Sequence, residues 1–143
     1  MSKAELKLAY LNTVYSVFLG TGKYNITIGK SAPGEICKIL KTTNVKTGYV
    51  LTACNPKSKK LTADENKIRN SELKAELVDL ECMVIDAIGA GQDQVWAAEE
   101  SFFILGIDEN QVERLAIKYG QNAYVKVAGN SPATLIFSAI WNE

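Results

Sequence analysis

The alternation of apolar and polar residues along the chain predicts short strands mixed with amphipathic helices. At the start, the capping pair Ser2 and Glu5 precedes apolar residues at helical spacing, which predicts a first helix. Two runs rich in β-branched and aromatic residues, 13–19 and 24–28, flank a glycine turn and predict a β-hairpin. A second helix is expected to begin at Pro33, because proline is favoured in the first turn of a helix.

The stretch from Tyr49 to Ser58 organises the remainder of the sequence. Residues 49–54 are a β-rich apolar run, which we interpret as a strand that ends abruptly at Asn55 and Pro56. Proline has no backbone N–H and pushes the preceding residue out of the helical region, so neither a strand nor a helix continues through this dipeptide. We therefore expect the polar residues that follow to form a turn.

A third helix is predicted from about residue 63 to residue 80, with Thr62 and Glu65 as its capping box. Its stripe of leucines continues backwards at helical spacing to Asn70 and Asn66. Two amides thus occupy the core-facing side of the helix, directly after the Asn-Pro turn. Because buried amides are costly without hydrogen-bond partners, we expect polar groups to face them.

The second half of the chain predicts two strands, one helix and a final hairpin. The expected elements are strands at 81–88 and 101–107, a helix capped by Asp108 and Gln111, and strands at 123–127 and 133–137. From residue 49 the order is therefore β-α-β-β-α-β, which is typical of the ferredoxin-like split β-α-β arrangement.

We accordingly predict an α+β fold with a ferredoxin-like core at about 49–127. In this prediction strands 49–54 and 101–107 lie at the centre of a mainly antiparallel sheet, with the helices on one face. An N-terminal helix, hairpin and second helix extend the core, and so does an extra C-terminal strand. A different order of the α+β layers is the alternative.

Composition and charge exclude several classes of protein. The length fits a single globular domain over residues 1–143, of which 47% are hydrophobic and 22% charged. Sixteen basic residues offset sixteen acidic ones, so no net field favours nucleic acid or an anionic membrane surface. No apolar run approaches the ~20 residues of a membrane span, and the first residues carry no apolar signal segment. We expect a cytoplasmic protein that binds neither nucleic acid nor membrane.

Histidine is absent, which excludes Ser-His-Asp and Cys-His nucleophiles and histidine-ligated metal sites. The three cysteines, Cys37, Cys54 and Cys82, are widely spaced. This spacing argues against a disulfide framework and against a structural zinc site. We expect no metal and no cofactor.

One polar cluster is predicted where the central strand ends and the third helix begins. Its candidate members are Asn55, Ser58, Asn66 and Asn70, and Gln121 would join them if the sheet pairs as proposed. The cluster is either a pocket for a small molecule or an anion, assisted by the positive end of the helix dipole, or a turn in which the amides satisfy one another and the backbone. We favour the second interpretation.

Four further residues are considered on chemical grounds. Glu99 and Glu100 could serve as general acid and base, but adjacent residues of a strand point to opposite faces, so one of them is expected in solvent. Ser101 lacks a histidine base, and no Ser-x-x-Lys motif places a lysine beside it. Trp96 fits a loop anchor as well as a stacking platform for a ligand.

Several pieces of the sequence together match one known family. They are Tyr10-x-x-Thr13-x-Tyr15, Ile28-Gly29, Thr52-Ala-Cys-Asn55-Pro56-Lys-Ser58, Glu65-Asn66, Trp96 with Glu99 and Ser101, and Gly120-Gln121-Asn-Ala123. In these pieces the chain resembles the bacterial DUF3293 family, a domain of unknown function, over about residues 10 to 126. The family commonly has an aromatic residue where Cys54 stands, which argues against Cys54 as a nucleophile. The resemblance implies a shared polar site but no particular reaction.

Two hypotheses of different class follow for the function. The first is a ligand- or partner-binding module, with regulation as one use, whose partner is an unknown small molecule or protein. The second is a histidine-free enzyme that uses carboxylate and amide groups on a phosphate- or carbonyl-containing small molecule. The absence of any motif with fixed catalytic spacing favours the first hypothesis. A concave pocket that holds an ionisable residue with a strongly shifted pKa would favour the second.

Overall fold

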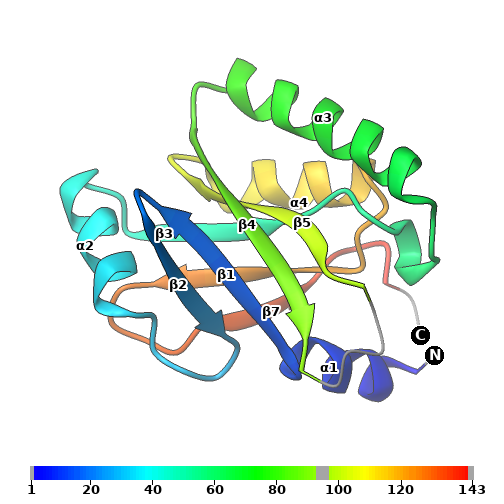
Figure 1. Cartoon of the computed structure of the whole chain (residues 1–143), viewed down its shortest axis with the longest axis horizontal. Coiled ribbons are helices and arrows are strands. Elements are labelled where there is room, and N and C mark those ends of the chain that lie inside the picture. Colours follow the sequence, from blue (N-terminus) through cyan, green and yellow to red (C-terminus); the bar gives the residue numbers. More distant parts are fainter. Residues whose placement is uncertain (1, 93–96, 142–143) are drawn as a thin grey trace.

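The computed structural model describes residues 2–92 and 97–141 and shows helices packed on both sides of a curled sheet (Figure 1). In chain order the elements are α1 (Lys3–Leu11), β1 (Thr13–Leu19), β2 (Gly22–Thr27), α2 (Gly34–Thr42), β3 (Thr47–Leu51), the single 3-10 turn η1 (Pro56–Ser58), α3 (Ala63–Asp79), β4 (Met83–Gly91), β5 (Glu99–Leu105), α4 (Glu109–Lys118), β6 (Ala123–Ala128) and β7 (Thr134–Phe137). None of these helices is both long enough and apolar enough to cross a membrane.

The seven strands form one sheet in the order β2-β1-β4-β5-β3-β6-β7, and every neighbouring pair is antiparallel. The predicted α+β class is therefore confirmed. Strands β3 and β5 pair in the interior of the sheet, as their continuous apolar sequences predict, because such strands are buried on both faces. The sheet curls until its two ends approach each other, where Ile28 after β2 forms a bridge with Ala133 before β7.

Each face of the sheet has its own hydrophobic core. Helices α3 and α4 cover one face, where Leu73, Leu77 and Val112 meet the side chains of Leu51 and Ile104. The opposite face belongs to a second core, formed by β1, β2 and α2 together with the other faces of β3, β5 and β6. The buried residues of this second core are Tyr15, Val17, Ile26, Ile36, Leu40, Val50, Ala87, Phe103, Leu105, Val125, Val127 and Ala133.

The prediction that the helices share one face is wrong for α1 and α2, since Tyr10 of α1 and Ile36 of α2 both pack with the second core. The curl of the sheet makes its second face concave, and the hairpin β1–β2 does not cover that face alone. The apolar stripe of α2, with Ile36 and Leu40 almost fully buried, completes the cover. Only α3 and α4 lie together on the first face.

The helix starts follow the predicted capping residues. Ser2 accepts a hydrogen bond from the N–H of Glu5 at the start of α1. Complete capping boxes begin the two helices of the first face, with Thr62 and Glu65 at α3 and Asp108 and Gln111 at α4. Local sequence therefore fixes where these helices begin, because each cap satisfies N–H groups that have no partner within the helix.

The strand predicted over 49–54 ends three residues early, at Leu51. Beyond Leu51, hydrogen bonds made by side chains replace the backbone ladder between strands. The hydroxyl of Thr52 donates to the Glu100 carbonyl at 2.6 Å, and the N–H of Ala53 donates to Asn70 Oδ1 at 2.8 Å. The apolar pattern continues to Cys54 because these residues are buried, although they no longer belong to the ladder.

Gly48 tests the packing between β3 and β5. A Cβ atom on Gly48 would lie 2.6 Å from Phe103 Cε1 and 2.9 Å from Leu105 Cδ2. Because Phe103 is fully buried, Gly48→Ala should lower the free energy of unfolding by about 1–3 kcal/mol, measured by urea denaturation.

The matched control is Gly34→Ala in the first turn of α2, where a Cβ would meet nothing within 4 Å. Its stability should stay equal or rise by up to about 1 kcal/mol, because alanine is favoured over glycine in a helix. Equal urea midpoints for Gly48→Ala and the wild type would contradict the tight packing described here.

Candidate functional site

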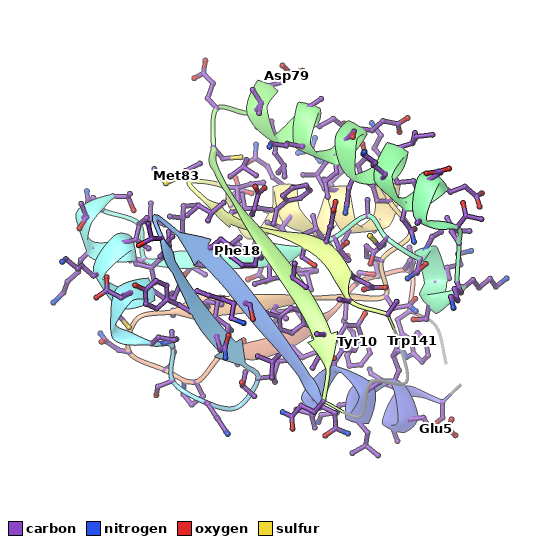
Figure 2. The ribbon with its side chains drawn as sticks, viewed as in Figure 1. Glu5, Tyr10, Phe18, Asp79, Met83 and Trp141 are labelled. Atoms are coloured by element: carbon purple, nitrogen blue, oxygen red, sulfur yellow. The ribbon has the colours of Figure 1, made fainter. Side chains whose placement is uncertain are left out.

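A cavity of about 160 Å³ lies at the end of the sheet next to α1. It is lined from α1, β1, β4, β5, the Asn-Pro turn (residues 55–58) and the residues just before β6. The lining residues are Leu6, Ala9, Tyr10, Thr13, Tyr15, Cys54, Asn55, Ser58, Gly89, Gly91, Ala97, Glu99, Gln121 and Asn122. Figure 2 shows Tyr10 on the side of α1 that faces the sheet, whereas Glu5 on the same helix points to solvent.

Three residues form one row across the sheet at the wall of this cavity. Tyr15 of β1 pairs with Gly89 of β4, and Gly89 pairs with Glu99 of β5. Directly paired residues of antiparallel strands point to the same face, so all three belong to the cavity side. A Cβ on Gly89 would lie 3.1 Å from Tyr15 Cε1, so the tyrosine ring occupies the space that glycine leaves free. Burial is the main cause of the raised pKa of Tyr15, and the charge of Glu99 contributes to it.

Glu99 is the acidic group among the described lining residues. Its removal from water raises the pKa of the carboxyl, and one hydrogen bond opposes this shift. Asn55 Nδ2 donates that bond to Glu99 Oε2 at 2.5 Å, and burial remains the larger effect. Burial, followed by the charge of Glu99, raises the pKa of Tyr10; burial is also the main cause of the raised pKa of Tyr15. The lining of the cavity therefore includes one carboxyl and two tyrosines whose phenols stay neutral.

Asn55 is held so firmly that the orientation of its amide is determined. Its Oδ1 accepts hydrogen bonds from the Leu61 N–H and from Asn66 Nδ2, both at 2.9 Å. The Asn55 N–H in turn donates to Asn66 Oδ1 at 2.9 Å. Since two donors already meet Oδ1, the amide nitrogen must be the atom that faces Glu99. Glu99 Oε2 is thus an acceptor in this contact.

Side chains also satisfy the backbone that leads into the turn. Asn70 is buried and joins the Ala53 N–H to the Glu100 carbonyl, with both bonds at 2.8 Å. Arg69 Nε donates to the Ala53 carbonyl at 2.7 Å, and its Nη2 donates to the Tyr119 carbonyl. Gln121 Nε2 donates to the Cys54 carbonyl at 2.9 Å. The amides that the sequence places in the core therefore bond mainly to backbone groups that have left the sheet.

The turn itself has an unusual backbone. Asn55, Lys57 and Ser58 all have left-handed φ angles, of 49°, 54° and 60°. Residues other than glycine rarely adopt this conformation, and each instance costs on the order of 1–3 kcal/mol. Gly120 holds the turn from the other side, because its carbonyl accepts from the Lys57 N–H at 2.6 Å. A Cβ on Gly120 would lie 2.8 Å from Pro56 Cβ, so this approach requires glycine.

The predicted cluster divides between two sides of the Asn55–Glu99 contact. Asn55, Ser58, Glu99 and Gln121 line the 160 Å³ cavity, and Asn122 Nδ2 donates to Ser58 Oγ at 3.2 Å. A second cavity of about 410 Å³ lies against the start of α3 and shares Cys54, Asn55, Ala97 and Glu99 with the first. The residues found in its lining but not in that of the first are Lys60, Leu61, Ala63, Asp64, Asn66, Lys67, Asn70, Ala98 and Glu100.

The remaining candidates contribute less to the first cavity. Ser101 is buried and is not among the lining residues of this cavity; its hydroxyl donates to the Glu99 carbonyl at 3.2 Å. Glu100 is exposed and lies on the opposite face from Glu99, as the alternation of a strand predicts. Trp96 lies outside the described residues. Burial raises the pKa of the Cys54 thiol, which keeps it protonated and makes it a poor nucleophile. Within residues 2–92 and 97–141 no three acidic or cysteine side chains gather as metal ligands would.

Sequence reasoning missed Tyr10, Tyr15 and Asn122 as cavity residues and Arg69 as a backbone partner. The first three stand within the family-like pieces quoted above, so the signal was present but was read only as resemblance. Arg69 gave no signal, because one arginine on a helix is usually solvated.

A substitution at Asn66 tests whether its amide has a fixed hydrogen-bond partner or faces an open pocket. Because Asn66 exchanges two hydrogen bonds with Asn55, Asn66→Leu should lower the free energy of unfolding by about 1–3 kcal/mol in the absence of any ligand. Thermal and urea denaturation measure this loss, and Asn110→Leu on the exposed side of α4 is the matched control. Equal stability of the two variants would show that the Asn66 amide faces an open pocket instead.

Comparison with known proteins gives one match. The family model described as "Protein of unknown function (DUF3293)" matches residues 51–124, more than half of the 143 residues. The matched segment includes the Asn-Pro turn, Glu99 and Gln121, whereas Tyr10 and Tyr15 precede it. No curated protein and no solved structure matches the chain. By this match the chain belongs to the DUF3293 family.

Proposed function

We propose that the chain is a small-molecule-binding module and that the 160 Å³ cavity beside Glu99 is its binding site. One observation carries the proposal: a cavity with room for one small molecule is lined mainly by apolar and amide side chains, and Glu99, the one carboxyl among its described lining residues, has a single amide as its hydrogen-bond partner there. Perturbed carboxyls in concave pockets cluster at functional sites. A ligand that bonds to Glu99 would compensate for the water that the carboxyl has lost.

The backbone beside the cavity supports the same proposal. Three left-handed residues within positions 55–58 cost stability, and so does the desolvated Glu99. Costly features of this kind persist together where a function requires them. Hydrogen bonds from the turn to Asn66 and Gly120, and one from Asn122 to Ser58, hold the turn in place before any ligand arrives, which lowers the entropy cost of binding.

A histidine-free enzyme is the second candidate, and the raised pKa of Glu99 favours it. A general acid or base works best when its pKa lies near the working pH, and burial moves a carboxyl in that direction. A carbonyl compound suits this chemistry, since Tyr10 and Tyr15 could donate hydrogen bonds to its oxygen. A phosphate compound receives no support, because no lysine or arginine is among the described lining residues.

Two further assignments belong to this proposal. We propose that residues 49–127 are a ferredoxin-like core, supported by the order β4-β5-β3-β6 with antiparallel neighbours. We also propose that the protein works in the cytoplasm, since its three cysteines are free.

A thermal-shift screen of small metabolites tests the binding proposal. Compounds that raise the melting temperature of the wild type should lose this effect with Ala9→Phe, which places a ring in the cavity. Ala4→Phe, on the exposed side of the same helix, is the matched control and should keep the effect. A screen without any compound that distinguishes these two variants contradicts the proposal. A compound recovered chemically changed after incubation would favour the enzyme.

The pH dependence of stability tests the environment of Glu99. The folded-state pKa is raised, so the folded protein keeps the proton while the unfolded chain releases it. The wild type should therefore lose stability as pH rises from the unfolded pKa through the folded pKa of Glu99. The glutamine in Glu99→Gln cannot titrate. The free energy of unfolding of this variant should therefore exceed that of the wild type by little in acid, and the difference should grow as pH rises from the unfolded-state pKa to the folded-state pKa of Glu99.

Urea denaturation at a series of pH values measures this difference. Glu100→Gln removes the same charge from the exposed neighbour and is the control for a general electrostatic effect. An advantage of Glu99→Gln that does not change with pH, or that Glu100→Gln shares, would show that the Glu99 carboxyl is not desolvated.

A further inference from the structure

We infer that the cavity takes a small organic cation, with an ammonium group against the Glu99 carboxylate and an apolar body against Tyr10, Tyr15 and Leu6. This inference rests on the proposed function, because it names the class of molecule that the same cavity binds. Four features of the lining support it.

The first feature is the charge of the cavity. Among its fourteen described lining residues Glu99 is the one acid, and none is lysine or arginine. Lys74, Lys118 and Lys126 pair with other acidic residues, and no ion pair between two described residues includes Glu99. A carboxylate enclosed by protein is costly unless an opposite charge pairs with it. A bound ammonium group would supply that charge, whereas an anion would be repelled.

The second feature is the set of groups that surround Glu99. Tyr10 faces it from α1 and Tyr15 from β1, and both remain neutral because burial raises their pKa values. Cys54 approaches from the end of β3, and burial raises its pKa as well. Lys60 and Lys67 line the second cavity, beyond the Asn55 contact, and neither is among the groups that shift the pKa of Glu99. No protein cation within the described residues therefore neutralises Glu99.

The third feature is that the carboxylate is already oriented. Asn55 Nδ2 donates a hydrogen bond to Glu99 Oε2. The Asn55 amide is itself fixed by hydrogen bonds from Leu61 and Asn66 to its Oδ1. One carboxylate oxygen is thus anchored, and the other has no hydrogen-bond partner among the described residues. An ammonium group has three donors and suits such an acceptor. Tyr10 and Tyr15 line the same cavity, and aromatic rings attract a cation through their quadrupole.

The fourth feature is size. A dry apolar cavity of about 150 Å³ holds one benzene molecule. The present cavity, of about 160 Å³, therefore accommodates one ring or a branched chain of similar volume that carries a single polar group. Leu6, Ala9 and Gly91 supply apolar wall for such a body. Nucleotides and other large ligands exceed this space.

Three probes of one shape test the inference: benzylamine as the cation, benzyl alcohol as the neutral analogue and benzoate as the anion. Titration calorimetry with the full chain should give benzylamine a Kd at least tenfold lower than benzyl alcohol, and no measurable binding of benzoate. Glu99→Gln should raise the Kd of benzylamine at least tenfold while changing that of benzyl alcohol less than threefold. Glu100→Gln, the charge-matched control, should change neither value.

The backbone amides of Gly89, Gly91 and Asn122 provide a readout that needs no variant, because their NMR signals should shift on addition of benzylamine. Equal binding of benzylamine and benzyl alcohol, with shifts at these amides, would overturn the cation inference and leave the binding module intact. Tighter binding of benzoate than of benzylamine would overturn it as well. So would an equal loss of benzylamine affinity in Glu99→Gln and Glu100→Gln. The proposal of a binding module is contradicted only if the metabolite screen yields no compound that stabilises the wild type and loses this effect with Ala9→Phe.

Discussion

The structure depends on how the chain between Leu51 and Leu61 leaves the sheet. A backbone that departs from a buried strand must find new partners for its N–H and carbonyl groups, because no water reaches them. Here side chains from distant parts of the sequence take that role, with Asn70 and Arg69 at Ala53 and Gln121 at Cys54. Helix α3 and the segment that follows α4 are thereby tied to the same two residues, Ala53 and Cys54.

The cavity is a consequence of this arrangement. Asn66 fixes the backbone and the side chain of Asn55, so that the amide nitrogen of Asn55 is directed at Glu99. On the opposite wall Gly89 leaves room for the Tyr15 ring, which approaches the same carboxyl. The two interpretations weighed from the sequence, a hydrogen-bonded turn and a polar pocket, are thus not exclusive. Asn66 bonds to Asn55 in the turn, and Asn70 bonds to Ala53 just before it. These bonds position the residues that line the cavity.

The fold was more predictable from the sequence than the site. Caps, turn residues and apolar periodicity are local signals, so they indicated α3 and α4 and the pairing of β3 with β5. The early end of β3 and the position of α2 were missed, because both depend on contacts between residues far apart in sequence. The same limit applies to the cavity. Tyr10 and Glu99 are nearly ninety positions apart, and no spacing rule brings them together.

The dominance of amides around one carboxyl has a physical rationale. Asparagine and glutamine donate and accept hydrogen bonds without titrating, so the bonds from Asn66, Asn70 and Gln121 keep their geometry at any pH at which the protein is folded. Glu99 can then gain or lose its proton, or meet a charged ligand, without loss of the bonds that hold the turn. A histidine or a lysine in the same positions would change charge and partners within or near the physiological range. An amide-rich turn thus keeps its shape constant while the charge beside it varies.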